Sequence, residues 1–163
     1  MDAIDELLEQ NDAYAAQFAS GGRGAAPKKQ LAIVCCMDSR IHLEAALGLE
    51  IGDAHMIRNA GGRVADALRS LAISQTLLGT NEVAIIHHTD CGMVMFTDES
   101  IRRKLREERG VEAEEVEFLP FTDLEQSVRD DIEIYRRSPL VRHDIPVRGF
   151  IYDVNSGRLS EVA

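Results

Sequence analysis

LAIVCCMDSR (31–40) contains an apolar run that ends abruptly at Asp38 and Ser39. A short apolar run with a polar end is typical of a strand buried on both faces of a parallel sheet. EVAIIHHTDCG (82–92) repeats this pattern, and AHMIRNAGG (54–62) predicts another strand, which breaks into a turn. The three segments predict the buried strands of an α/β core.

The segments between and after these strands carry helical signals. Helices are predicted over 41–49, over 64–78 with Gly79 as C-cap, and from a capping box of Thr122 and Glu125 to a stop before Pro139. The charged stretch 98–117 predicts a solvated helix followed by an acidic loop. Alternating strands and helices favour a mostly parallel sheet flanked by helices. At 163 residues, 45% of them hydrophobic, the chain is long enough for one such domain and short for two.

The N-terminus predicts an arm separate from this core. Apolar residues recur at helical spacing between Ile4 and Phe18, so residues 2–18 predict an amphipathic helix that needs a surface to lie on. The stretch 20–27 is rich in Gly and Ala, as expected for a flexible connector. We expect a single domain over 1–163, in which 1–27 form the arm helix and linker and 28–163 form the α/β core.

Composition limits the partners and the compartment. A formal charge of −10 disfavours nucleic acid and anionic membranes as partners, since both repel an acidic surface. No apolar run approaches the roughly 20 residues that span a bilayer, and the acidic N-terminus is unlike a signal peptide. The three cysteines, two of them adjacent, make a poor disulfide framework and favour reduced thiols or metal ligands. We therefore expect a cytoplasmic protein.

Metal-binding side chains follow two of the predicted strands. Cys36 ends the first strand, and His88 and Cys91 end the third. Because the carboxyl ends of parallel strands face one crevice, these side chains can converge on one site. Two thiolates and an imidazole suit tetrahedral Zn²⁺ and suit Mg²⁺ or Ca²⁺ poorly. Three protein ligands with an open position are the pattern of a catalytic zinc, which lowers the pKa of a bound water.

Two charged residues accompany Cys36. Asp38 lies two positions beyond it, so strand alternation can direct both side chains into the same crevice, and Arg40 lies two positions further on. A carboxylate there can accept a hydrogen bond from bound water, and a guanidinium can hold the carboxylate in a bidentate grip. Asp38 can instead become the fourth ligand and close the site, with Arg40 drawing it away. The sequence leaves both arrangements open.

The combination of CMDSR (36–40) and HTDCG (88–92) resembles the signature of β-class carbonic anhydrases. IRNAGG (57–62) and GFIYDVNSGRL (149–159) also look like that family, so the resemblance covers most of the chain from Leu31 onward. It implies zinc-dependent, reversible hydration of carbon dioxide to bicarbonate and a proton.

The resemblance also assigns roles and an assembly. It implies Cys36, His88 and Cys91 as zinc ligands, with Asp38 and Arg40 as the catalytic dyad. It further implies an antiparallel edge strand at the C-terminal end of the sheet. The family's active site lies at a dimer interface, so a homodimer or tetramer is expected, with the N-terminal helix wrapping a partner subunit.

Two other functions fit the same residues. A related zinc hydrolase would act on carbon disulfide or carbonyl sulfide at the same site, and a non-catalytic zinc or redox sensor would use the adjacent Cys35 and Cys36. Alternation along the strands favours a core role for Cys35 and a packed or hydrogen-bonded role for His87. We expect Asp90 to face solvent or to cap a turn, and Gly61 to allow close backbone approach at the crevice wall.

Overall fold

The computed structural model describes residues 2–163 and contains one five-stranded sheet in the order β2-β1-β3-β4-β5. β1 (Leu31–Cys36), β2 (Ala54–Asn59), β3 (Glu82–His88) and β4 (Val147–Tyr152) are parallel to one another. β5 (Leu159–Glu161) pairs antiparallel with β4 at one edge. The predicted α/β class, the mostly parallel sheet and the antiparallel C-terminal edge strand are confirmed.

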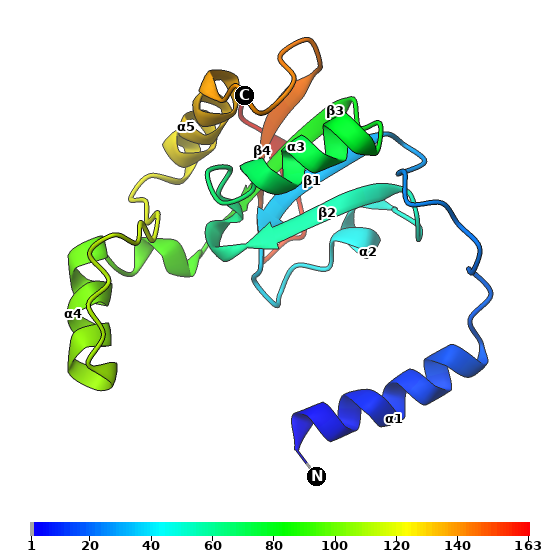
Figure 1. Cartoon of the computed structure of the whole chain (residues 1–163), viewed down its shortest axis with the longest axis horizontal. Coiled ribbons are helices and arrows are strands. Elements are labelled where there is room, and N and C mark those ends of the chain that lie inside the picture. The colour runs from blue at the N-terminus through cyan, green and yellow to red at the C-terminus, as the bar shows by residue number, and fades with distance from the viewer. Residues whose placement is uncertain (1) are drawn as a thin grey trace.

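Helices cover both faces of this sheet (Figure 1). The helices α3 (Leu68–Leu77) and α5 (Leu124–Arg137) contribute to one core cluster, and α2 (Leu43–Leu47) contributes to the other. Alternate residues of the central strands enter opposite clusters, because successive strand side chains point to opposite faces. Ala32 and Val34 pack in the first cluster, and Ile33 and Cys35 in the second. Burial on both faces explains why these strands are continuously apolar.

Several expected helix boundaries differ from the structure, and the helix expected over 41–49 is the shorter α2. The helix predicted from residue 64 begins at Leu68, because residues 64–67 form a turn, in which Ala67 N–H donates to the carbonyl of Val64 at 2.8 Å, after the 3₁₀ turn η1 (Ala60–Gly62). The expected capping box at Thr122 is wrong by one residue. Asp123 is the N-cap of α5, and its carboxylate accepts the backbone N–H of Gln126 at 2.8 Å.

The charged helix α4 (Asp98–Arg109) projects to one side of the sheet (Figure 1). Thr97 caps its N-terminus through a reciprocal bond with Ser100, and Gly110 ends it in a left-handed conformation. None of its residues is fully buried, in agreement with the solvated helix expected from the sequence.

The N-terminal helix α1 (Ala3–Ala16) lies apart from the sheet (Figure 1). Its N-cap Asp2 closes a capping box with Asp5, and none of its residues is buried. Leu7 is 67% exposed, and the neighbouring apolar side chains of the same helix are also exposed. Across residues 2–163, no helix combines the length and the apolar character needed to traverse a bilayer.

Candidate metal centre

The order of the strands creates a crevice between β1 and β3. The chain passes from β1 to β2 on one side and from β3 to β4 on the other, so the connections leave the two central strands in opposite directions. In open parallel sheets, ligands bind at such a switch point, outside the carboxyl ends of the strands. Cys36 ends β1 and His88 ends β3, so both residues lie at this point.

The three predicted metal ligands meet there. Ligand atoms of Cys36, His88 and Cys91 all lie within 4.8 Å of one another, and all three residues are buried. The pairing of β1 with β3, which aligns Cys35 with Ile86, brings the two strand ends level. A turn after β3 then carries Cys91 back toward the crevice. Its residue Asp90 has a φ of +53°, a left-handed conformation that Asp tolerates better than most residues.

One nitrogen of His88 is arranged as a metal ligand. Its Nδ1 lies 2.8 Å from the carbonyl oxygen of Thr89, so Nδ1 carries the proton and donates to that carbonyl. This leaves Nε2 with a free lone pair, and Nε2 has no hydrogen-bond partner among the described residues although it is buried. An unpaired buried polar atom is costly unless something binds it. A cation at this position would satisfy it, in the arrangement usual for metal-binding histidines.

The contact between the thiols of Cys36 and Cys91 shifts their pKa values in opposite directions. A hydrogen bond from Cys91 is the main cause that lowers the pKa of Cys36, with further help from the backbone N–H groups of Asp38 and Gly61. The same contact with Cys36 raises the pKa of Cys91, because a second thiolate beside the first is unfavourable. A divalent cation removes this conflict by binding both sulfurs as thiolates. The donor set of two sulfurs and one imidazole nitrogen therefore fits Zn²⁺.

The η1 turn closes one side of the site. The N–H of Gly61 donates to Cys36 Sγ at 3.3 Å. A Cβ atom on Gly62, whose φ is +66°, would lie 2.8 Å from the backbone nitrogen of Cys36 and 3.0 Å from the carbonyl oxygen of Ile86. Only glycine at position 62 allows the turn to approach the strands this closely, whereas the close approach was expected from sequence at Gly61.

Asp38 and Arg40 form a bidentate ion pair beside the ligands. Arg40 Nε donates to Asp38 Oδ1 at 2.9 Å, and Nη2 donates to Oδ2 at 2.8 Å. These bonds are the main reason that the pKa of Asp38 lies well below its usual range. Asp38 Oδ2 lies 3.7 Å from the unpaired Nε2 of His88, so the carboxylate borders the position that a metal would occupy.

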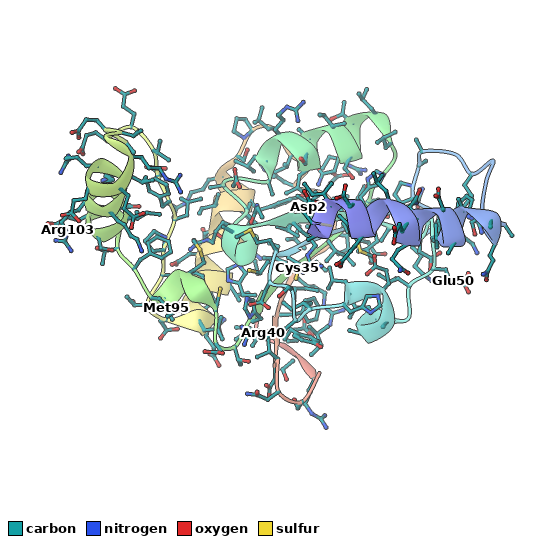
Figure 2. The ribbon with its side chains drawn as sticks, turned by 90° about the horizontal axis from the view of Figure 1, so that it is seen from below. Asp2, Cys35, Arg40, Glu50, Met95 and Arg103 are labelled. Carbon is teal, nitrogen blue, oxygen red and sulfur yellow. The ribbon has the colours of Figure 1, made fainter. Side chains whose placement is uncertain are left out.

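Asp90 faces solvent as expected, with its side chain 78% exposed, but its bonds to Arg40 were not predicted from the sequence. Arg40 Nη1 donates to its carboxylate at 2.8 Å, and Nη2 donates to its backbone carbonyl at 2.9 Å. Arg40 thus joins the segment after β1 to the segment after β3 (Figure 2, where Arg40 is labelled). No short-range sequence signal indicates this partner, which lies 50 positions away.

Arg58 fixes the segment that carries Asp38. Its guanidinium donates to the carbonyl oxygens of Cys36, Ile41 and Asp38 at 2.9, 3.0 and 2.7 Å. The side chain therefore holds the loop after β1 at three points.

A cavity of about 390 Å³ opens beside the ligand atoms. Cys36, Asp38 and Cys91 are among its lining residues. Apolar side chains from η2 (Gly92–Val94), α4 and nearby loops also line it, including Met93, Phe96, Ile101 and Phe118. The site therefore combines polar groups with an apolar wall, suited to a small uncharged molecule.

Comparison with known proteins identifies the family. The family model described as "Carbonic anhydrase" matches residues 31–159. The chain is 43% identical to beta-carbonic anhydrase 1 of Mycobacterium tuberculosis over 165 aligned residues, which cover 99% of both chains. The chain belongs to the β-carbonic anhydrase family. Among solved β-carbonic anhydrases and their relatives, a carbonic anhydrase from Streptococcus mutans superposes with a TM-score of 0.95 at 48% identity, covering 100% of this chain and 99% of the other.

A second group of relatives carries a different name. Carbon disulfide hydrolase of Acidianus is 33% identical over 181 aligned residues, which cover 96% of this chain and 87% of that protein. This identity is lower than the identity to the beta-carbonic anhydrase of Mycobacterium tuberculosis and to the carbonic anhydrase of Streptococcus mutans.

Proposed function

We propose that this member of the β-carbonic anhydrase family catalyses the zinc-dependent, reversible hydration of carbon dioxide to bicarbonate and a proton. The observation that carries the proposal is the convergence of Cys36, His88 and Cys91 on one point, with a buried Nε2 that has no partner among the described residues. Cys36, His88 and Cys91 would hold the metal. Bound there, zinc would supply Lewis acidity that lowers the pKa of a coordinated water toward neutrality.

Asp38 and Arg40 are the proposed catalytic dyad. Arg40 holds both oxygens of Asp38, which leaves lone pairs of an ionised carboxylate beside the ligand atoms. Asp38 can then accept a hydrogen bond from a water molecule in the site and orient it toward the substrate. If Asp38 instead became the fourth ligand, Arg40 would have to release it. The ion pair between Arg40 and Asp38 supports the arrangement in which water would take the fourth position.

The apolar wall is the proposed substrate pocket. Carbon dioxide is small and uncharged, so it can lie against Met93 and Phe96 without leaving a polar group unpaired. Bicarbonate carries a charge that this wall does not stabilise, and the wall therefore favours its release.

A pair of cysteine variants tests this proposal. Cys36→Ala should lose zinc and stopped-flow carbon dioxide hydration together, because one of three ligands is gone. Cys35→Ala is the matched control, since Cys35 is a neighbouring buried cysteine that is absent from the group of ligand atoms. It should keep one zinc per chain and most of the activity. Full zinc content and full activity in Cys36→Ala would refute the assignment.

Carbon disulfide or carbonyl sulfide is the alternative substrate, and the likeness to carbon disulfide hydrolases favours testing it. The same ligands and the same apolar wall would serve this reaction. Parallel turnover assays of the zinc-loaded protein with carbon dioxide and with carbon disulfide separate the two. We expect hydration of carbon dioxide to be faster, in keeping with the higher identity to named carbonic anhydrases.

A redox sensor built on Cys35 and Cys36 is disfavoured by the environment of Cys35. Burial raises the pKa of Cys35 to about 11, so its thiol stays protonated near neutral pH. A protonated, fully buried thiol is a poor partner for thiol oxidation. Cys35 is therefore better explained as a small core residue.

We also propose that the chain is one domain with an arm, and that it assembles as a homodimer or tetramer. Residues 1–27 would form the arm and linker, and 28–163 the core. The exposed apolar side chains of α1 support this, because an amphipathic helix that buries nothing in its own chain needs another surface. A partner subunit would supply that surface.

Sedimentation of the full chain tests the assembly. Leu7→Glu should shift the protein toward monomer, because it places a charge on the apolar side of α1. Gln10→Glu is the control, since it adds the same charge at a residue that is already polar. A wild-type protein that sediments as a monomer at micromolar concentration would contradict the proposal.

The cytoplasm is the proposed location. The reduced, buried thiols of Cys36 and Cys91 suit a compartment that keeps cysteines reduced. Fractionation of cells that express the full chain would test this placement.

A further inference from the structure

A buried ion cluster lies behind the metal centre, on the face of the sheet covered by α5. Asp131 of α5 is fully buried, and its two carboxylate oxygens accept bonds from three other residues. Oδ1 accepts from Arg63 Nε at 3.2 Å and from Arg63 Nη2 at 3.0 Å. Oδ2 accepts the backbone N–H of Val64 at 3.1 Å and lies 2.9 Å from His87 Nε2.

These bonds reach both segments that form the metal centre. Arg63 and Val64 directly follow the η1 turn, and His87 directly precedes the ligand His88. His87 is held at its other nitrogen by Ser127 Oγ at 2.7 Å, also from α5. One carboxylate on α5 therefore fixes the end of η1 relative to the end of β3.

The η1 turn in turn touches a ligand atom. Gly61 donates its N–H to Cys36 Sγ, and Gly62 lies so close to β1 that no Cβ would fit. A small shift of the turn would lengthen the N–H···S bond or push on the backbone of Cys36. Cys36, the turn and Asp131 thus form a continuous chain of contacts from the metal centre to α5.

We propose that Asp131, together with Arg63, is a positioning residue of the metal centre, which holds η1 and the end of β3 in the geometry that lets Cys36 and His88 bind the same ion. Asp131 touches neither the ligand atoms nor the cavity, so it acts only through the segments that it ties together. The inference rests on the proposed zinc site but does not depend on which substrate the enzyme takes. Removing a residue that hydrogen-bonds a metal ligand directly changes metal affinity by roughly 10- to 100-fold, and Asp131 acts through one further contact, so this range is the upper limit for its effect.

Asp131→Asn is the first test. The asparagine amide has nearly the same shape as the aspartate carboxylate. Its NH₂ group would face hydrogen-bond donors of the surrounding residues, where the carboxylate oxygen had accepted a bond. We expect the affinity for zinc, measured by competition with a chelator, to fall by up to roughly 10- to 100-fold. We also expect the thiolate-to-cobalt absorption band of the Co²⁺-substituted protein to shift or weaken, because that band reports sulfur–metal geometry.

Ile132→Ala is the matched control. Ile132 is the next residue of α5 and is buried in the core, where it packs over Gly149 of β4 and away from η1. The Ile132→Ala variant should have a lower melting temperature than the wild type, because it loses buried apolar contacts. Its zinc affinity should stay within about threefold of wild type, and its cobalt absorption band should be unchanged. An equal loss of zinc affinity in this variant would overturn the proposal, since general loosening of α5 would then explain both results.

Arg63→Met provides a second variant in case Asp131→Asn does not fold. It removes the guanidinium and leaves Asp131 bonded to Val64 and His87, so a smaller loss of zinc affinity, of roughly tenfold, is expected in the same direction. Wild-type zinc affinity and an unchanged cobalt band in the folded variants would overturn the inference alone. A wild-type protein that bound no zinc would overturn the proposed metal site as well.

Discussion

Two arginine–aspartate systems flank the metal centre, and they differ mainly in their access to water. In the outer system, the side chain of Arg40 is 44% exposed and that of Asp90 is 78% exposed, while that of Asp38 is 16% exposed. In the inner system, the corresponding values are 8% for Arg63 and 0% for Asp131. The outer system joins the segment after β1 to the segment after β3, and the inner system joins the segment after η1 to the end of β3. The outer one can exchange its bonds with water, whereas the inner one cannot.

This difference sets how much each system contributes to folding. An exposed ion pair typically contributes about 0–1 kcal/mol, because water solvates the separated charges almost as well. Removing one partner of a buried pair costs about 3–5 kcal/mol, because the other charge remains in the interior without compensation. The outer system is therefore free to rearrange during a reaction, and the inner system is a fixed support.

Asp131→Leu should give the largest effect on stability. The substitution leaves Arg63 and His87 without their acceptor in the interior, so we expect the free energy of unfolding to fall by about 3–5 kcal/mol. Urea titrations at neutral pH, followed by circular dichroism, measure this change. A loss below about 1 kcal/mol would show that the inner system is no more important to folding than the outer one.

Gly62→Ala should be nearly as damaging. The left-handed backbone costs an alanine roughly 1–2 kcal/mol, and the clash with the backbone of Cys36 adds about 1–3 kcal/mol. Gly79→Ala is the control, because Gly79 has a φ of +75° but no atom within 4 Å of an added Cβ. Gly79→Ala should lower the free energy of unfolding by the backbone contribution alone and keep full zinc affinity. Gly62→Ala should lower it by the backbone and clash contributions together and should also weaken zinc binding. Equal losses in the two variants would argue against tight packing at η1.

Arg40→Ala should separate activity from stability. We expect the free energy of unfolding to change by less than about 1 kcal/mol, because the bonds lost are exposed to water. Carbon dioxide hydration should fall by roughly 10- to 100-fold, since Asp38 loses the group that orients it. Stopped-flow assays on the zinc-loaded variant, compared with Asp90→Asn, measure the effect. Asp90→Asn keeps the backbone carbonyl that binds Arg40, and we expect it to retain more activity.

Asp153, which follows β4 at the carboxyl end of the strands, should give the smallest effect on stability. The N–H of Asn155, at 2.8 Å, is the main group that lowers the pKa of Asp153, and Thr89 Oγ1 contacts the same carboxylate oxygen at 3.4 Å. Because the folded pKa lies below the unfolded value of about 3.9, the ionised carboxylate stabilises the fold above that pH. The stabilisation is lost as the pH falls through the folded pKa. The gap in melting temperature between wild type and Asp153→Ala should therefore be constant above about pH 5 and close below about pH 4. A gap that widens on acidification would contradict this sign.

The ligands were predictable from sequence because their signals are local. Cys36 and His88 each follow an apolar strand, and parallel topology alone brings such ends together. His87 was expected to be packed or hydrogen-bonded on the opposite face, and its contacts with α5 agree with this. The roles of Asp38 and Arg40 were predicted from their spacing to Cys36 together with the resemblance to β-class carbonic anhydrases, and the structure contains the ion pair between them.

The supports of the site were not predictable in the same way. Asp131 lies on a helix with many charged residues, where a carboxylate is normally solvated, and its partners are more than 40 positions away in sequence. One signal was present, however. Ser127 and Asp131 are four positions apart and directly precede the apolar Val128 and Ile132, so they share the buried side of α5. Polar residues at such positions need partners, but a sequence does not name them.

The detached helix α1 has a consequence for how association can be observed. Helices of about 12–15 residues are marginally stable in water on their own, and α1 has 14 residues with none buried in its own chain. Its amide hydrogens should therefore exchange quickly in any subunit that is alone and slowly in one that is joined to another. Hydrogen exchange in this one segment, followed during dilution, would measure subunit encounter while the strands of the sheet report only global unfolding.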